Sequence, residues 1–168
     1  MDLTHRVDFS LDTEMSFEEA MEFVGDVPRS LQHADFLAEL QVLTGEPPQV
    51  QAAIPVSAAL FGQRELPFSS ELQRTSSGAR LLPLTIIPTG PGWAEVAGEA
   101  TVSDLGAGRR IDYAFVVTVH LRIPTADRWG TQALVRMIEF TADAVLRKVT
   151  QRLPETIAKA AASSVISV

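Results

Sequence analysis

Three histidines and one tyrosine are the side chains of this sequence with the clearest potential for chemistry. A zinc site needs three or four converging ligands, and His5, His33 and His120 show neither helical nor hairpin spacing relative to one another. The sequence contains no cysteine, which excludes disulfides, thiol nucleophiles and thiolate metal sites. His120 alternates out of phase with the apolar residues of its strand, so it should face away from the core. We therefore predict surface histidines, no metal site and no cofactor.

The charged side chains form patterns that are typical of solvated faces. Glu18 and Glu22 lie one helical turn apart and repel mildly. Arg109 and Arg110 lie close to Asp112. Such a cluster could bind a carboxylate, but it is more often a surface pair that contributes little to stability. No catalytic motif stands out, and we assign no catalytic residue.

Tyr113 and Trp93 are the two aromatic side chains that could serve a binding site. Tyr113 is the only tyrosine and falls on the apolar face of a strand, where a buried hydroxyl needs a partner. Either it is a polar group in a cavity, or it is part of an ordinary core with its hydroxyl tethered. Trp93 follows a Gly-Pro-Gly turn and either caps a cavity mouth or covers the end of the sheet.

The composition is that of a single globular domain. Of 168 residues, 46% are apolar and 21% charged, so one domain over residues 1–168 can bury a sizeable core. The formal net charge of −7 would repel phosphate backbones and anionic membranes, which argues against nucleic-acid binding. The sequence has no apolar run of about 18 residues, so no membrane span is predicted. The N-terminus lacks the apolar stretch of a signal peptide, which favours a cytoplasmic, bacterial-style protein.

The first part of the chain predicts one strand followed by two short helices. Residues 5–12 alternate apolar and polar side chains, as a half-buried strand does. Ser16 and Glu19 have the spacing of a capping box, which begins a short helix that ends near Gly25. Pro28 opens a second helical turn.

From residue 34 onward the apolar period is two, which predicts strands joined by short turns. Short turns connect antiparallel neighbours. We expect six such strands, at residues 36–42, 50–60, 66–72, 82–86, 96–102 and 109–123. Pro55 lies within the second of them and cannot donate a ladder hydrogen bond, so it marks an edge position or a bulge.

The last part of the chain predicts one long amphipathic helix. It begins at Ala126 and runs to Pro154, and the segment 160–168 is expected to fray. Its apolar stripe should pack on the sheet. We assign to this stripe Leu134, Met137, Ile138, Thr141, Val145, Val149 and Leu153.

This order of elements resembles the helix-grip superfamily, which includes START lipid-transfer domains, birch-pollen-allergen-like proteins, polyketide cyclases and a family of carbon-monoxide-dehydrogenase subunits. The chain also looks like an uncharacterised bacterial family of this type. The resemblance covers residues 5 to about 162, and residues 24–31 match the second small helix at the cavity mouth. It implies an α+β fold: a curved seven-stranded antiparallel sheet around a long C-terminal helix, with two short helices after the first strand. It also implies binding of an apolar small molecule and transfers no catalytic residues.

Small side chains on the inward strand faces agree with a cavity. They leave room either for a ligand or for close approach of the helix, and the resemblance favours the ligand. The small residues are Ala38, Ala52, Ala58, Ser70, Gly98 and Ala100. As ligand-binding residues we predict Tyr113, Phe115, Val117, Ser70, Phe68, Met137, Thr141, Val145 and Trp93.

Three functions are compatible with this sequence. The favoured one is a protein that binds or carries a hydrophobic small molecule or lipid between the sheet and the C-terminal helix. The second is a cyclase- or hydrolase-like enzyme, which ranks lower because the inward faces offer few polar groups. The third is a homodimeric interaction module that uses apolar outward positions. These positions are Ala53, Pro55, Ala59, Phe61, Ala114 and Val116.

Overall fold

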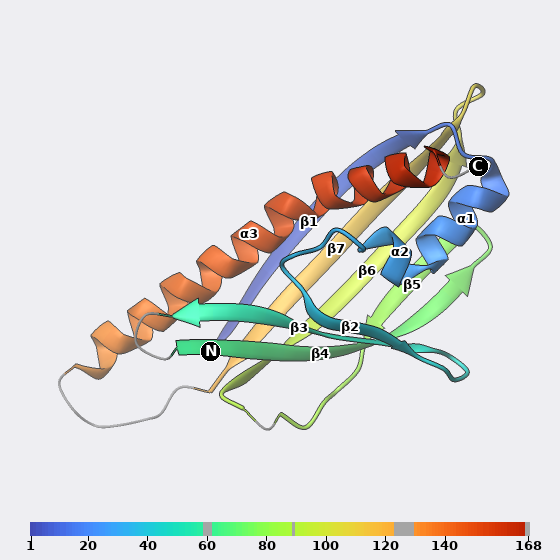
Figure 1. Ribbon diagram of the computed structural model, residues 1–168. Helices are drawn as coiled ribbons and strands as arrows, with labels where there is room; N and C mark the ends of the chain where they lie inside the picture. Colours follow the sequence, from blue (N-terminus) through green and yellow to red (C-terminus); the bar gives the residue numbers. More distant parts are fainter. Residues whose placement is uncertain (59–61, 89, 123–129, 167–168) are drawn as a thin grey trace.

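The computed structural model describes residues 1–58, 62–88, 90–122 and 130–166, and it places a long helix across one face of a seven-stranded antiparallel sheet (Figure 1). The strand order is β1-β7-β6-β5-β4-β3-β2. This architecture confirms the predicted helix-grip fold. The strands are β1 (Asp2–Thr13), β2 (Ala38–Leu43), β3 (Gln49–Ala58), β4 (Gly62–Thr75), β5 (Gly78–Pro83), β6 (Gly92–Asp104) and β7 (Arg109–Leu121). The helices are α1 (Phe17–Gly25), α2 (Val27–Ser30) and α3 (Thr131–Ile166).

The three strands β1, β7 and β6 form the most regular part of the sheet. Phe9 of β1 lies opposite Tyr113 of β7, which lies opposite Ala100 of β6. Because side chains alternate along a strand, these three share the inner face with every second neighbour. In β7 the inward positions Ile111, Tyr113, Val117 and Val119 are all buried. The strict alternation in the sequence therefore fixes which face meets the helix.

The two short helices α1 and α2 cover the other end of the inner face (Figure 1). A capping box begins α1: the Ser16 hydroxyl accepts from the Glu19 N–H at 3.2 Å, and the Glu19 carboxylate accepts from the Ser16 N–H at 2.7 Å. Ala20 and Phe23 of α1 are fully buried, which attaches the helix to the core. Asp26 ends α1 and caps α2 by accepting from the Arg29 N–H at 3.2 Å.

Helix α3 is longer than expected, and the prediction that it ends at Pro154 is wrong. Pro154 lies inside the helix, where it removes one backbone hydrogen bond at a cost of about 3 kcal/mol. Beyond it, Ile157, Ala160 and Ala161 are at most 3% exposed, and their burial offsets that cost. The expected fraying from residue 160 is therefore also wrong as far as Ile166. Residues 126–129, where the helix was expected to begin, lie outside the described residues.

The sheet-facing stripe of α3 differs in part from the expected one. The buried positions are Ala142, Leu146, Val149, Leu153, Ile157 and Ala160, so only Val149 and Leu153 of the predicted stripe are fully buried. Met137 was expected inside and is 50% exposed. The N-terminal half of α3 is apolar on both faces, so periodicity alone could not choose between them.

Several sheet boundaries also differ from expectation. The strand expected over 82–86 ends at Pro83, and the one expected over 66–72 extends over all of β4. Pro55 pairs with Glu65 of β4, while the pairing of β2 with β3 reaches only Ala53, so Pro55 has the predicted edge position. Ala53 faces outward but is only 5% exposed, and Ala59 and Phe61 lie outside the described residues. No helix among the described residues is both long and apolar enough to cross a membrane.

Candidate ligand-binding site

A small cavity lies between the inner face of the sheet and the three helices. Its volume is about 40 Å³. Its lining residues come from α1, α2, β4, β5, β6, β7 and α3. They include Val24, Val27, Leu72, Leu81, Tyr113, Phe115 and Ile157. The space is therefore apolar on almost every side.

Small residues on β5 and β6 create this space. Ala79 and Ala100 pair across the two strands, and Leu81 pairs with Gly98. A Cβ atom on Gly98 would lie 2.7 Å from the ring of Phe115, closer than van der Waals contact permits. The absence of a side chain at Gly98 therefore lets the Phe115 ring lie across β6 and form one wall.

Tyr113 supplies the polar group of the cavity. Its side chain is 4% exposed, and its hydroxyl has no hydrogen-bond partner among the described residues. The ring stacks on Phe9 with centroids 4.9 Å apart and lies 5.9 Å from Phe115. Burial raises the pKa of Tyr113, so the phenol stays protonated. The Tyr113 side chain thus lines the cavity, and its neutral hydroxyl makes no hydrogen bond to the described residues.

The cavity is smaller than the sequence led us to expect. A volume of about 40 Å³ holds roughly one or two water molecules, whereas pockets for drug-sized ligands usually exceed ~300 Å³. The small inward residues therefore serve mainly close packing in this conformation. Any larger ligand requires α1, α2 or α3 to move away from the sheet.

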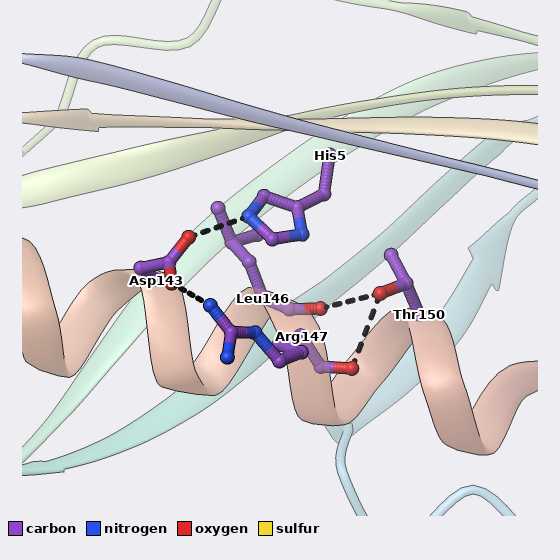
Figure 2. A network of polar contacts seen from close by, with 5 residues as sticks. All are labelled: His5, Asp143, Leu146, Arg147 and Thr150. Carbon is purple, nitrogen blue, oxygen red and sulfur yellow. Dashed lines mark hydrogen bonds and ion pairs between the residues drawn. The ribbon is translucent and has the colours of Figure 1, made fainter.

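A polar network ties helix α3 to the first strand (Figure 2). The His5 side chain on the inner face of β1 reaches Asp143 of α3, with Nε2 and Oδ1 2.7 Å apart. Arg147, one turn along the helix, donates to the other oxygen of Asp143 at 2.5 Å. These interactions, led by the hydrogen bond from His5, lower the pKa of Asp143. His5 is thus an inward side chain that fastens the helix, and the expectation of a surface histidine is wrong.

Two further contacts hold the remaining length of α3. Arg29 of α2 donates to the Ser164 hydroxyl at 3.0 Å, close to the helix end. Arg152 pairs with Asp35, in the segment before β2, at 2.6 Å. The helix is therefore fastened at three points along its length. Two of these contacts use residues in or after α2, Arg29 and Asp35, and other residues of α2 line the cavity.

Of the predicted ligand-binding residues, Tyr113 and Phe115 line the cavity. Four others lie in the core or pack against it: Phe68, Val117, Ser70 and Val145. Ser70 is fully buried and donates to the Val96 carbonyl oxygen at 2.6 Å, so its hydroxyl is already satisfied. Thr141 donates to the Met137 carbonyl oxygen at 2.9 Å within the helix.

Trp93 and Met137 lie away from the cavity, in contrast to their predicted role. Trp93 is on the outer face, where its ring stacks on His120 at 4.7 Å and lies 5.7 Å from the Arg122 guanidinium. Strand parity explains this position, because Trp93 is out of phase with the inward residue Val96. His120 lies outward as expected, and its Nδ1 is 2.9 Å from Asp2.

The predicted ligand-binding residues did not include the helix residues that line the cavity. Ile157 of α3 lines the cavity, but it was overlooked because the helix was expected to stop at Pro154. Val24 begins the segment 24–31 that the resemblance placed at the cavity mouth, but it was not among the predicted ligand-binding residues. The capping box before that face was the signal that could have placed α1 over the sheet.

A larger hollow, of about 380 Å³, lies on the outer face of β1, β7 and β6. Its outward side chains are polar or small: Asp8, Ser10, Glu99, Thr101, Asp112 and Ala114. Ser10 donates to Asp112 at 2.5 Å, and Asp8 pairs with Arg6 at 2.7 Å. Within the described part of the chain, no group of three or more histidine, aspartate or glutamate side chains could hold a metal ion. With three carboxylates in its lining, Asp8, Glu99 and Asp112, this hollow suits an apolar ligand less well than the inner cavity does.

Comparison with known proteins supports the fold and is silent about activity. A family model described as "Protein of unknown function (DUF3809)" matches residues 8–151. No curated protein matches the chain. Three solved structures are similar over almost its whole length.

The first is a protein of unknown function from Staphylococcus aureus, with 10% identity, coverage of 99% of this chain and 98% of that chain, and a TM-score of 0.55. The second is a protein from Thermus thermophilus, with 14% identity, coverage of 95% of this chain and 99% of that chain, and a TM-score of 0.53. The third is the di-domain ARO/CYC protein BexL from the BE-7585A biosynthetic pathway, with 10% identity, coverage of 95% of this chain and 50% of that chain, and a TM-score of 0.52. At these identities the similarity shows a common fold.

Proposed function

The chain belongs to the DUF3809 family of proteins of unknown function, and we propose that it binds a neutral, apolar small molecule between the sheet and helix α3. The observation that carries this proposal is the Tyr113 hydroxyl, which is buried in an apolar space without a partner among the described residues. An unpaired buried hydroxyl costs about 1–3 kcal/mol. A ligand with one hydrogen-bonding group would remove that cost.

The charges near the cavity favour a neutral ligand. Arg80 and Glu99 contribute to the cavity lining, but both alternate outward and pair with each other at 3.6 Å. A carboxylate or ammonium group inside the cavity would therefore lack a counter-ion and would be strongly disfavoured. A ring system or short chain with a single hydroxyl or carbonyl group matches the wall chemistry.

Binding explains this site better than catalysis does. Besides Tyr113, the only side-chain hydroxyl among the described lining residues is that of Ser30, which donates to the Phe23 carbonyl oxygen at 2.5 Å. General acid–base or nucleophilic chemistry needs at least two groups within hydrogen-bond reach of the reacting atoms. A lone protonated phenol can orient a ligand, and the one carboxylate among the described lining residues, Glu99, alternates outward and pairs with Arg80.

Ligand entry requires movement of the α1–α2 region in this proposal. The cavity measures only about 40 Å³, and α2 is tied to α3 by the hydrogen bond of 3.0 Å from Arg29 to Ser164. That contact lies near the end of the helix and can be broken at modest cost, because a single hydrogen bond with a charged partner contributes about 1.5–3 kcal/mol. The α2 side is therefore the proposed entrance.

A neutral fluorescent probe tests the proposal, and the chain offers a matched pair of variants. Ala100→Leu fills the cavity from the inner face of β6, whereas Ala97→Leu adds the same atoms to the outer face three residues away. Titration with N-phenyl-1-naphthylamine should be saturable for the wild-type protein and for Ala97→Leu. It should be weakened at least about tenfold for Ala100→Leu.

Far-UV circular dichroism and thermal unfolding must show that both variants are folded, since overpacking can destabilise by about 1–3 kcal/mol. Absence of saturable binding to the wild-type protein would contradict the proposal. Equal affinity of a folded Ala100→Leu variant would place the probe elsewhere and contradict it as well.

A further inference from the structure

The N-terminal half of α3 carries an apolar stripe on the side that faces away from the sheet. Four exposed residues form this outer stripe: Ala133, Met137, Phe140 and Ala144. At 3.6 residues per turn they lie about 140–180° around the helix from the sheet-facing residue Ala142. Phe140 is 77% exposed and Met137 is 50% exposed. In the view of Figure 1 these first turns of α3, in orange, extend past the end of the sheet.

The same helix face is polar farther along. Arg147, Gln151 and Glu155 continue the outward direction and are all exposed. The change from polar to apolar within one face argues against a chance distribution of surface residues. A helix segment with apolar residues on two opposite faces normally buries both of them, which indicates that something covers the outer face of residues 133–144.

The spacing of the outer stripe fits a second helix. Steps of four, three and four residues between 133, 137, 140 and 144 are those of a coiled-coil seam, where side chains of two helices interlock. We propose that a second copy of this chain covers the outer stripe. The two α3 helices then pack antiparallel about a two-fold axis near residues 138 and 139.

Charge selects the antiparallel arrangement. Arg136 and Asp143 lie on the same flank of the outer stripe, and Arg136 makes no ion pair with the described residues. An antiparallel pair centred between them brings each Arg136 to the partner's Asp143. In a parallel pair this flank would face the opposite flank of the partner helix, so Arg136 could not reach the partner's Asp143.

The net charge argues against a membrane as the occupant. A formal charge of −7 repels anionic lipid, and the flank of the stripe carries the acidic Asp143 as well as Arg136. An amphipathic helix that lies on a membrane usually has a lysine- and arginine-rich polar face. A self-complementary flank suits a two-fold partner, because an isologous interface brings the same surface of both copies together.

Sedimentation velocity over a range of concentrations tests this interface. The wild-type chain should form a concentration-dependent dimer, and Phe140→Glu should raise its dissociation constant at least about 100-fold, since two buried rings are lost per dimer. The matched control is Ile87→Glu, because Ile87 is 94% exposed and lies outside α3. The control should leave the dimer unchanged.

Spin labels distinguish the arrangement, and the cysteine-free sequence makes single labels specific. Labels at Gln151→Cys and at Glu155→Cys should be about 38 Å and about 50 Å apart along the axis in the antiparallel dimer. The difference of about 12 Å between these two distances does not depend on which residues lie at the two-fold axis. Moving the label by four residues lengthens the distance by about 1.5 Å per residue on each of the two copies.

Three results would overturn the proposal. The first is a monomer at every concentration, including one that binds neutral phosphatidylcholine vesicles through the stripe. The second is a dimer that survives Phe140→Glu in a folded protein. The third is a pair of label distances that are equal, as a parallel pairing would give. Since the outer stripe and the cavity are on opposite sides of α3, the test is independent of ligand binding.

Discussion

Replacing Tyr113 with phenylalanine should stabilise the protein in the absence of a ligand. The change removes only the hydroxyl, and the ring contacts with Phe9 and Phe115 remain. An unpaired buried hydroxyl costs about 1–3 kcal/mol, so the free energy of unfolding should rise by about 1–2 kcal/mol. For a chain of this size each kcal/mol shifts the midpoint by about 2–4 °C, which predicts an increase of roughly 2–8 °C.

Equilibrium unfolding in urea provides the assay, with an unchanged m-value as the sign that only stability has changed. Ser70→Ala is the matched control, because Ser70 is fully buried but donates to Val96 at 2.6 Å. The free energy of unfolding of Ser70→Ala should fall by about 1 kcal/mol. If Tyr113→Phe is destabilised to a similar extent, the phenol has a partner and the reasoning about the cavity fails.

The stability advantage of Tyr113→Phe over the wild type should become larger at alkaline pH. Burial raises the pKa of Tyr113 in the folded protein, while an unfolded tyrosine ionises near pH 10. Folding therefore retains a proton that the unfolded chain releases, and the wild type loses stability as the pH rises above about 10. The stability difference between Tyr113→Phe and the wild type should widen there and stay constant between about pH 6 and pH 9.

Three other perturbations test the elements around the site. His5 and Arg147 lower the pKa of Asp143, so its contribution to stability is complete above about pH 4 and is lost as the pH falls through the lowered pKa. The melting temperatures of the wild type and Asp143→Asn should therefore converge in acid. A constant difference between the two melting temperatures down to pH 2 would show that the contacts of Asp143 with His5 and Arg147 do not stabilise the fold. Ser16→Ala removes the cap of α1 and should cost about 0.5–2 kcal/mol in urea unfolding, whereas an unchanged midpoint would show that α1 does not need its capping box. Leu146→Ala leaves a cavity at a fully buried position on the sheet-facing side of α3 and should lower the free energy of unfolding by about 2–5 kcal/mol. A decrease below about 1 kcal/mol would mean that the helix is not packed there.

The sheet could be predicted from the sequence because its information is local. Strict alternation from Ile111 to Val119 identifies β7 and its inner face, and the short turns dictate antiparallel neighbours. The capping box at Ser16 likewise identifies α1 before any tertiary contact is known. These features depend on residues that are close together in the chain.

Features that depend on tertiary contacts could not be predicted in this way. Pro154 normally ends a helix, and only the burial of Ile157 and Ala160 explains why α3 continues. His5 looked like a surface residue because its partner Asp143 lies 138 residues away. The volume of the cavity depends on how closely α1 and α3 approach the small residues of β5 and β6, which no sequence pattern encodes.

The proposed binding site is tested most directly by methyl NMR. In a titration with N-phenyl-1-naphthylamine, we expect saturable shifts of the methyl groups of Val24, Leu72 and Ile157, which line the cavity from three different elements. The methyl groups of Ile87 and Met137, both exposed and outside the cavity, should not shift. Shifts confined to these surface methyl groups, with the cavity methyl groups unchanged at saturation, would contradict the claim that the protein binds its ligand between the sheet and α3.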